Sequence, residues 1–289
     1  MPALHTARQR ISATGEISSK IDGQRQSGNQ QSLPNSVIDS LYQQGSARIR
    51  FPNAQDNALQ AVLLNTAGGL TGDDNIHWKA TANTDSHLCI STAACEKIYR
   101  THGPAAQQRT TLKVASGARL EWLPQESILF NGSNLNRSLD VQLEQGAEAL
   151  LIESLIFGRR AMHETTTDIC LRDQWRIFRG DALVHAEQLH IDTRNNHSLH
   201  SPAQLHHYSA LSTIVLLSNH SYQMLELMSE KTRGLLSSQP DVARLGASIL
   251  PQRLVIRMLA KDSYQLRKIL IPCIELINEN RAVPAVWKV

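Results

Sequence analysis

The stretch Leu59–Ala80 reads LQAVLLNTAGGLTGDDNIHWKA and places two short apolar segments on either side of a glycine-rich turn. Residues 61–64 are continuously apolar, whereas Ile76, Trp78 and Ala80 alternate with polar residues after the turn. Alternation with a period of two is typical of a strand that buries one face. The sequence therefore predicts a strand, a tight turn and a second strand here.

Short apolar runs of this kind, bounded by Gly, Asn, Asp or Ser, continue along most of the chain. A helical period is almost absent between Thr6 and Asp192. Two later segments, Tyr222–Arg233 and Ser263–Asn280, carry apolar residues at helical spacing, and Asp262 or the serine after it is a suitable N-cap. These patterns predict a mainly β protein with a few helices in its C-terminal third.

The N-terminal segment is polar. Residues 23–32 are almost entirely Gln, Ser, Asn and Gly with one Arg, a composition that cannot bury much apolar surface. We expect residues 1–35 to form a mobile N-terminal arm or a poorly packed first hairpin. Residues 36–289 are then expected to form a single domain.

Composition excludes several classes of partner. The 29 basic and 26 acidic side chains are interspersed and give a net charge of +3, which is too small to predict binding to nucleic acid or a membrane surface. The chain shows neither an apolar run of bilayer length nor a signal-peptide pattern. Its four cysteines form no C-x-x-C pair. A cytoplasmic protein with reduced thiols is the expectation.

The glycine-rich turn at residues 65–74 invites comparison with a phosphate-binding loop. Such loops need a G-K-[S/T] or G-x-G-x-x-G pattern that opens a helix, whereas this turn leads into a strand. The carboxylates of Asp73 and Asp74 would also repel an anion. We therefore expect a tight connection with positive φ at one or more of its glycines and with local turn hydrogen bonds accepted by the two aspartates.

Paired carboxylates leave an enzymatic alternative open. Glu121 with Glu126, or Glu153 with Glu164, would suit a stand-alone β-rich hydrolase or a sugar-binding module, although their separation in space is not known from sequence. Seven histidines lie between His185 and His220, and imidazole suits Ni²⁺ as well as zinc and copper. Neither an H-x-x-x-H nor an H-x-H pair with a third ligand stands out, so any metal site here stays unassigned.

The turn closely resembles a family motif. Its sequence NTAGGLTGDD is similar to the N-x-x-G-G-L-x-G-G-D turn of the urease accessory protein D family (UreD, also called UreH). Asp73 stands where that family usually has a second glycine, so the family-type carboxylate falls on Asp74. If the position needs a positive φ, Asp tolerates it better than most residues.

Further blocks resemble the same family, in the same order. They are STAACEKIYR at 91–100, LEWLPQE at 120–126, LIESLIFGR at 151–159 with MHE at 162–164, LVHAEQL at 183–189, which includes Glu187, and VPAVW at 283–287. The residues that carry the motifs are Gly68, Gly69, Gly72, Lys97, Tyr99, Arg100, Trp122, Pro124, Gly158 and Arg159.

The resemblance implies a two-layered β-helical body with helices near the C-terminal end. It also implies a scaffold that binds UreF, which recruits the GTPase UreG, and that docks on the urease apoprotein so that nickel is inserted. A protein of this kind catalyses no bond change, has no catalytic residues and holds no permanent cofactor, although Ni²⁺ can bind transiently.

Nickel on this model passes through polar internal passages, which require oxygen or nitrogen groups that release the ion. Carboxylates that point inward from strands fit, because a buried carboxylate is costly unless it is solvated, paired or metal-bound. From their places in the family-like blocks, the candidates are Asp74, Glu96, Glu153 and Glu187.

Overall fold

The structure of the 289-residue chain is a computed structural model. It describes residues 10–23, 35–53, 56–158, 168–194, 199, 201, 204–236 and 243–288. Within these ranges the chain folds into two β-sheets, with helices near its C-terminal end. This arrangement confirms the mainly β prediction.

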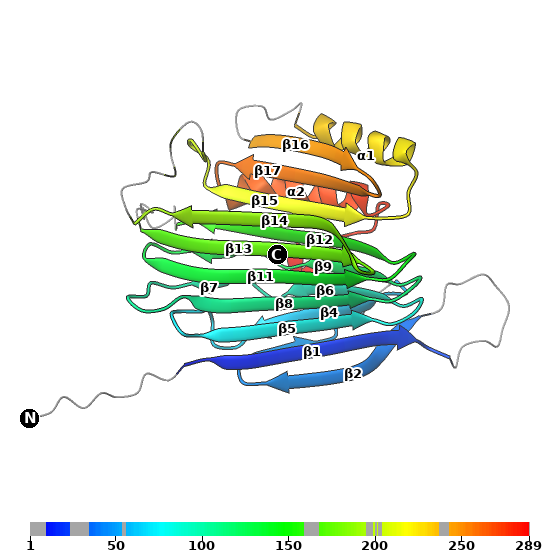
Figure 1. Cartoon of the computed structure of the whole chain (residues 1–289), viewed down its shortest axis with the longest axis horizontal. Coiled ribbons are helices and arrows are strands. Elements are labelled where there is room, and N and C mark those ends of the chain that lie inside the picture. The colour runs from blue at the N-terminus through cyan, green and yellow to red at the C-terminus, as the bar shows by residue number, and fades with distance from the viewer. Residues whose placement is uncertain are drawn as a thin grey trace, which may run out of the picture.

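The strands of the two sheets are stacked as layers (Figure 1). In spatial order, the seven-stranded sheet contains β14 (Ala182–Asp192), β13 (Ile169–Arg179), β11 (Ser133–Leu143), β8 (Ala106–Val114), β5 (Asn75–Ala82), β1 (Ser12–Ile21) and β2 (Ser36–Gln44). The ten-stranded sheet contains β16 (Ala243–Leu250), β17 (Arg253–Ala260), β15 (Ala210–Leu217), β12 (Glu148–Phe157), β9 (Arg119–Leu123), β6 (His87–Thr92), β4 (Leu59–Asn65) and β3 (Ala47–Arg50), with β10 (Ser127–Leu129) beside β12 and β7 (Glu96–Ile98) beside β10.

The chain coils between the two sheets. Strands β5, β8, β11 and β13 are parallel neighbours in one sheet, and β4, β6, β9 and β12 are parallel neighbours in the other. The chain alternates between these two sets, with the short strands β7 and β10 inserted after β6 and β9, so every pair adds one turn of a two-layered β-helix. The fold implied by the family resemblance is therefore confirmed.

Alternation of side chains builds the core between the layers. In β5, Ile76, Trp78 and Ala80 are buried and face the interior, as their spacing predicts. In β12 nearly every residue is buried, because one face packs between the sheets and the other packs under the helices. A strand covered on both faces reads as a continuous apolar run.

Helices α1 (Tyr222–Gly234) and α2 (Ser263–Ile277) cover the outer face of the ten-stranded sheet near β15 to β17 (Figure 1). Asp262 is the N-cap of α2, where its side chain accepts a 2.8 Å hydrogen bond from the Gln265 backbone N–H, as predicted. The short 3₁₀-helix η2 spans Ala285–Trp287. Within the described parts of the chain, the helices lack the length and apolar character that a membrane span requires.

The segment expected to be a mobile N-terminal arm or a poorly packed first hairpin contains strand β1. Residues 12–21 form β1, which pairs with β2 on one side and with β5 on the other. Its inward positions are small or few, with Ala13 and Ile17 in the core and Gly15 against Trp78. A strand that buries so little apolar surface leaves a weak signal in the sequence. Most of the polar stretch at 23–32 lies outside the described residues.

Candidate functional site

A buried ionic cluster joins the two layers of the β-helix. Arg137 in β11 donates through Nη1 to Glu153 Oε2 in β12 at 2.6 Å. Its Nε and Nη2 donate to both oxygens of Asp173 in β13, at 3.1 and 2.5 Å. Arg137 and Asp173 are direct register partners on neighbouring strands. All three residues are buried, so the guanidinium binds two carboxylates away from solvent.

The cluster carries more negative than positive charge. Burial opposes the charge on Arg137, but Asp173 and Glu153 outweigh it and hold the pKa of the guanidinium above its usual value. Burial raises the pKa of Glu153 above its ordinary value against the attraction of Arg137, and the nearby negative charge of Asp173 raises it further. Trp122 Nε1 donates to the other Glu153 oxygen at 2.9 Å. The cluster is therefore suited to a proton or an additional cation.

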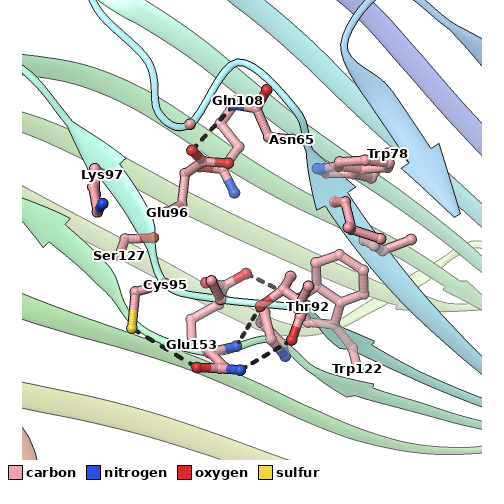
Figure 2. Close-up of a pocket in the computed structure, with 17 residues that line it drawn as sticks. Asn65, Trp78, Thr92, Cys95, Glu96, Lys97, Gln108, Trp122, Ser127 and Glu153 are labelled. Carbon is pink, nitrogen blue, oxygen red and sulfur yellow. Dashed lines mark hydrogen bonds between the residues drawn. The ribbon is translucent and has the colours of Figure 1, made fainter. Parts of the chain in front are cut away.

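A cavity of about 210 Å³ opens beside this cluster (Figure 2). Glu96, Glu153 and Gln108 line it together with Trp122, Pro124 and Lys97. Gln108 Oε1 is buried and has no hydrogen-bond partner among the described residues. A buried oxygen of this kind calls for water or a bound cation. The cavity thus brings two of the predicted carboxylates, Glu96 and Glu153, to the same space.

Glu96 is the less compensated of these two acids. Asn65, the first residue of the glycine-rich turn, donates through Nδ2 to Glu96 Oε1 at 3.1 Å. Burial raises the pKa of Glu96 from 4.5 to about 7, and this bond and the Lys97 backbone lower it only in part. No described Lys or Arg forms a salt bridge with Glu96. A divalent cation would supply the missing charge.

Glu187 lines a second cavity beside the cluster. A smaller cavity of about 30 Å³ is lined by Glu187, Glu153, Arg137 and Asp173. Burial disfavours the charged form of Glu187, but hydrogen bonds from His185 and the exposed Arg257, with their charges, lower its pKa to about 2. Glu153 lines both cavities, so it links the side of Glu96 to the side of Glu187.

Asp74 is not among the residues that line these two cavities. It is buried at the end of the glycine-rich turn, where its oxygens accept hydrogen bonds from the backbone N–H groups of Ile11 at 2.9 Å and Thr71 at 2.8 Å. These hydrogen bonds have a structural role, because they hold the turn against the chain that leads into β1. Its place in a passage stays a prediction.

The motif residues of the turn pack against the block at 96–100. The Leu70 backbone N–H donates a hydrogen bond to the Lys97 carbonyl, and the Tyr99 backbone N–H donates one to the Leu70 carbonyl. The Tyr99 hydroxyl donates to the Gly68 carbonyl. Gly69 has a φ of 148°, and a Cβ there would lie 2.4 Å from the Tyr99 ring. Asp73 has a φ of 67°, the left-handed conformation that its replacement of a family glycine suggested.

The other motif residues serve the same region. Gly72 leaves no room for a Cβ beside Thr101, and Arg100 covers Gly132. Gly158 donates its backbone N–H to Leu129 at the end of β10. Arg159, with Glu164, lies outside the described residues.

The carboxylates proposed for a hydrolase are held separately. Glu121 is hydrogen-bonded to the side chains of His87, Arg119 and Asn278. Glu126 is bonded to Arg267 of α2. Each acid thus has its own cationic partners, and the two share none of these contacts.

Sequence reasoning missed Arg137 and Asp173. Their signal was present, because each sits at an inward position between core residues: Leu135 and Leu139 flank Arg137, and Leu171 and Trp175 flank Asp173. A charged residue at an apolar position of an alternating strand predicts a buried ionic partner. The partner itself depends on the register of the coils.

Together these features define a two-layered β-helical protein with an acid-lined interior. The model of the UreD urease accessory protein family matches residues 23–288. Urease accessory protein UreD 1 of Brucella abortus biovar 1 (strain 9-941) is 38% identical over 283 residues, which cover 97% of this chain and 95% of that protein. Urease accessory protein UreD of Rhizobium etli is 38% identical over 286 residues, covering 99% and 98%. The chain belongs to the UreD family of urease accessory proteins.

Proposed function

We propose that this chain is a cytoplasmic scaffold for nickel insertion into urease. In this proposal it binds UreF and, through UreF, the GTPase UreG, and the assembly docks on the urease apoprotein. Membership of a family named for its accessory role in urease supports the proposal. The chain itself makes and breaks no bond in this role, and Ni²⁺ is its cargo rather than a permanent cofactor.

The interior carboxylates are the proposed route for Ni²⁺. The observation that carries this step is the position of Glu153, which borders both the cavity of Glu96 and the cavity of Glu187. The buried cluster at Glu153 has two carboxylates for one guanidinium, so its uncompensated charge attracts a cation.

Transit requires weak binding as well as attraction. Carboxylate oxygens hold Ni²⁺ less tightly than a complete set of imidazole or thiolate ligands does. Among the described residues, Glu96, Glu153 and Glu187 are not gathered into one compact set of ligands. An ion can therefore be passed from one carboxylate to the next, with water completing its coordination.

The proposal is tested by urease activation in cells that produce the urease subunits and the other accessory proteins. Omission of this chain should leave urease low in nickel and inactive, and its return should restore both. Affinity purification of this chain should recover UreF, and should recover UreG only when UreF is present. Full urease activation without the chain would contradict the proposal, as would failure to recover UreF.

A further inference from the structure

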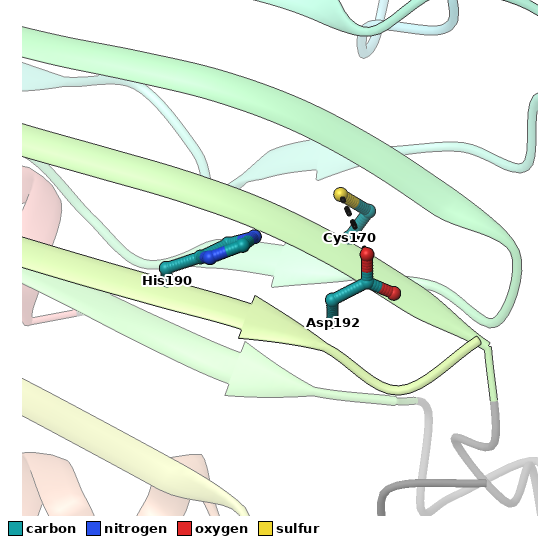
Figure 3. A group of neighbouring side chains, drawn as sticks. All are labelled: Cys170, His190 and Asp192. Atoms are coloured by element: carbon teal, nitrogen blue, oxygen red, sulfur yellow. Dashed lines mark hydrogen bonds between the residues drawn. The ribbon is translucent and has the colours of Figure 1, made fainter. Parts of the chain in front are cut away.

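A second group of metal-binding side chains lies outside the interior network. Cys170 in β13 and His190 and Asp192 in β14 place one ligand atom each within 4.8 Å of one another (Figure 3). Among the described residues, this is the group of three His, Cys, Asp or Glu side chains whose ligand atoms lie close enough together to hold one metal ion. It uses none of the carboxylates assigned to the passage.

The antiparallel pairing of β13 and β14 brings the three residues together. Cys170 is the direct register partner of Asp192, and His190 is two residues from Asp192 on the same strand. Because side chains alternate, His190 and Asp192 share a face, and both are within reach of Cys170. Leu171 and Leu189 pack on the core side, so the three ligands lie on the outer face of the seven-stranded sheet.

We propose that Cys170, His190 and Asp192 bind one divalent transition-metal ion of the class of Ni²⁺, Co²⁺ and Zn²⁺. Thiolate, imidazole and carboxylate are the ligands these ions take in proteins, at about 2.0 to 2.3 Å. Bonds of that length place ligand atoms about 3 to 4 Å apart. The Cys170 Sγ and Asp192 Oδ2 are already 4.0 Å apart, so small side-chain rotations close the site.

The residues around the group leave it open to an ion from solvent, and Arg194 orients the Asp192 carboxylate. His190 is exposed and borders two hollows in the surface, one of which Asp192 also borders. Arg194 donates its backbone N–H and Nε to Asp192 Oδ1 and its Nη2 to Oδ2. An ion on Oδ2 displaces Nη2 from the exposed Arg194, while the bonds to Oδ1 still hold the carboxylate.

Asn134 adds a further oxygen near the site. It is the register partner of Cys170 on β11, and its Oδ1 is buried without a hydrogen-bond partner among the described residues. Water or another exogenous ligand can complete the coordination.

On binding, the Cys170 thiol loses its proton to solvent, and the electron pair left on the sulfur forms the bond to the metal, with no change of oxidation state.

The test is titration of the reduced full-length chain with Co²⁺, followed in the near ultraviolet. A sulfur-to-cobalt charge-transfer band should appear at one equivalent and vanish when Zn²⁺ is added. Cys170→Ser should abolish the band. Cys95→Ser is the matched control, because Cys95 lines the interior cavity, and it should keep the band. A band that survives Cys170→Ser, or is lost only with Cys95→Ser, would overturn the proposal.

A second variant covers the case in which Cys170→Ser, at a buried position, fails to fold. His190 is exposed, so His190→Gln should leave thermal unfolding unchanged while Co²⁺ affinity falls by at least roughly tenfold. His77→Gln, on β5 of the same sheet, should bind Co²⁺ as the unmodified chain does. Unchanged affinity in His190→Gln, or absence of a band in the unmodified chain, would contradict the site.

Discussion

Arg137 donates a 2.6 Å hydrogen bond to Glu153 across the interior, so one ion pair ties the seven-stranded sheet to the ten-stranded sheet. Replacement of Arg137 by Met would leave Glu153 and Asp173 buried without a cation. Loss of one partner from a buried ion pair costs about 3 to 5 kcal/mol. Chemical denaturation of Arg137→Met should therefore show a loss of that size in the free energy of unfolding.

Arg109→Met is the control for that change. Arg109 is exposed on β8, and surface substitutions usually alter stability by no more than about 0.5 kcal/mol. Equal effects of the two variants would show that the buried cluster is not a special source of stability.

The carboxyl of Glu96 makes stability depend on pH in the opposite sense to a salt-bridged acid. Its pKa is about 7 in the folded chain against an ordinary value of 4.5, so folding favours the protonated form. Stability contributed by this group is present below about pH 4.5 and is lost as pH rises through about 7. Glu96→Gln removes the penalty and should raise stability above neutral pH, by on the order of 1 kcal/mol after allowance for partial exposure.

The measurement is the unfolding free energy of Glu96→Gln and the unmodified chain across this pH range. The difference should be largest at alkaline pH and should disappear toward pH 4.5. Glutamine can still accept the hydrogen bond from Asn65, so loss of that contact does not confuse the result. A variant less stable than the unmodified chain above neutral pH would refute the prediction.

Two neighbouring glycines should respond differently to alanine. At Gly69 a Cβ would meet the Tyr99 ring at 2.4 Å and the Lys97 carbonyl at 2.6 Å, so Gly69→Ala must displace the turn. At Gly68 an added Cβ would meet no heavy atom within 4 Å beyond the two adjacent residues, and only the positive φ opposes a side chain. We expect thermal unfolding to show a loss of about 1 kcal/mol for Gly68→Ala and a clearly larger loss for Gly69→Ala. Similar losses would mean that backbone strain alone decides both positions.

Local patterns in the sequence predicted strands better than their arrangement. Alternation of Ile76, Trp78 and Ala80 predicted β5, because one face of that strand is buried. Residues 12–21 were expected to lie in a mobile arm or a poorly packed first hairpin, because the inward side chains of β1 are too small for a strong strand signal. The stacking of parallel coils depends on long-range pairing, which alternation does not encode, and only the family resemblance implied it.

The candidate site shows the same division. Inward carboxylates were expected at Glu96 and Glu153, and both line the interior cavity. Pairing of Arg137 with Asp173 was not predicted, because it depends on the register between β11 and β13. Cys170 likewise meets His190 only through the pairing of β13 with β14, so a search for spaced histidines alone could not find that group.

The nickel content of urease tests the central claim most directly. Urease would be matured in cells with the double variant Glu96→Gln/Glu153→Gln, with recovery of UreF used to verify an intact complex. Loss of both carboxylates should lower nickel per urease on the order of tenfold. Asp140→Asn, at an exposed position of β11, should leave nickel unchanged. Normal nickel content with the double variant in an intact complex would contradict the passage.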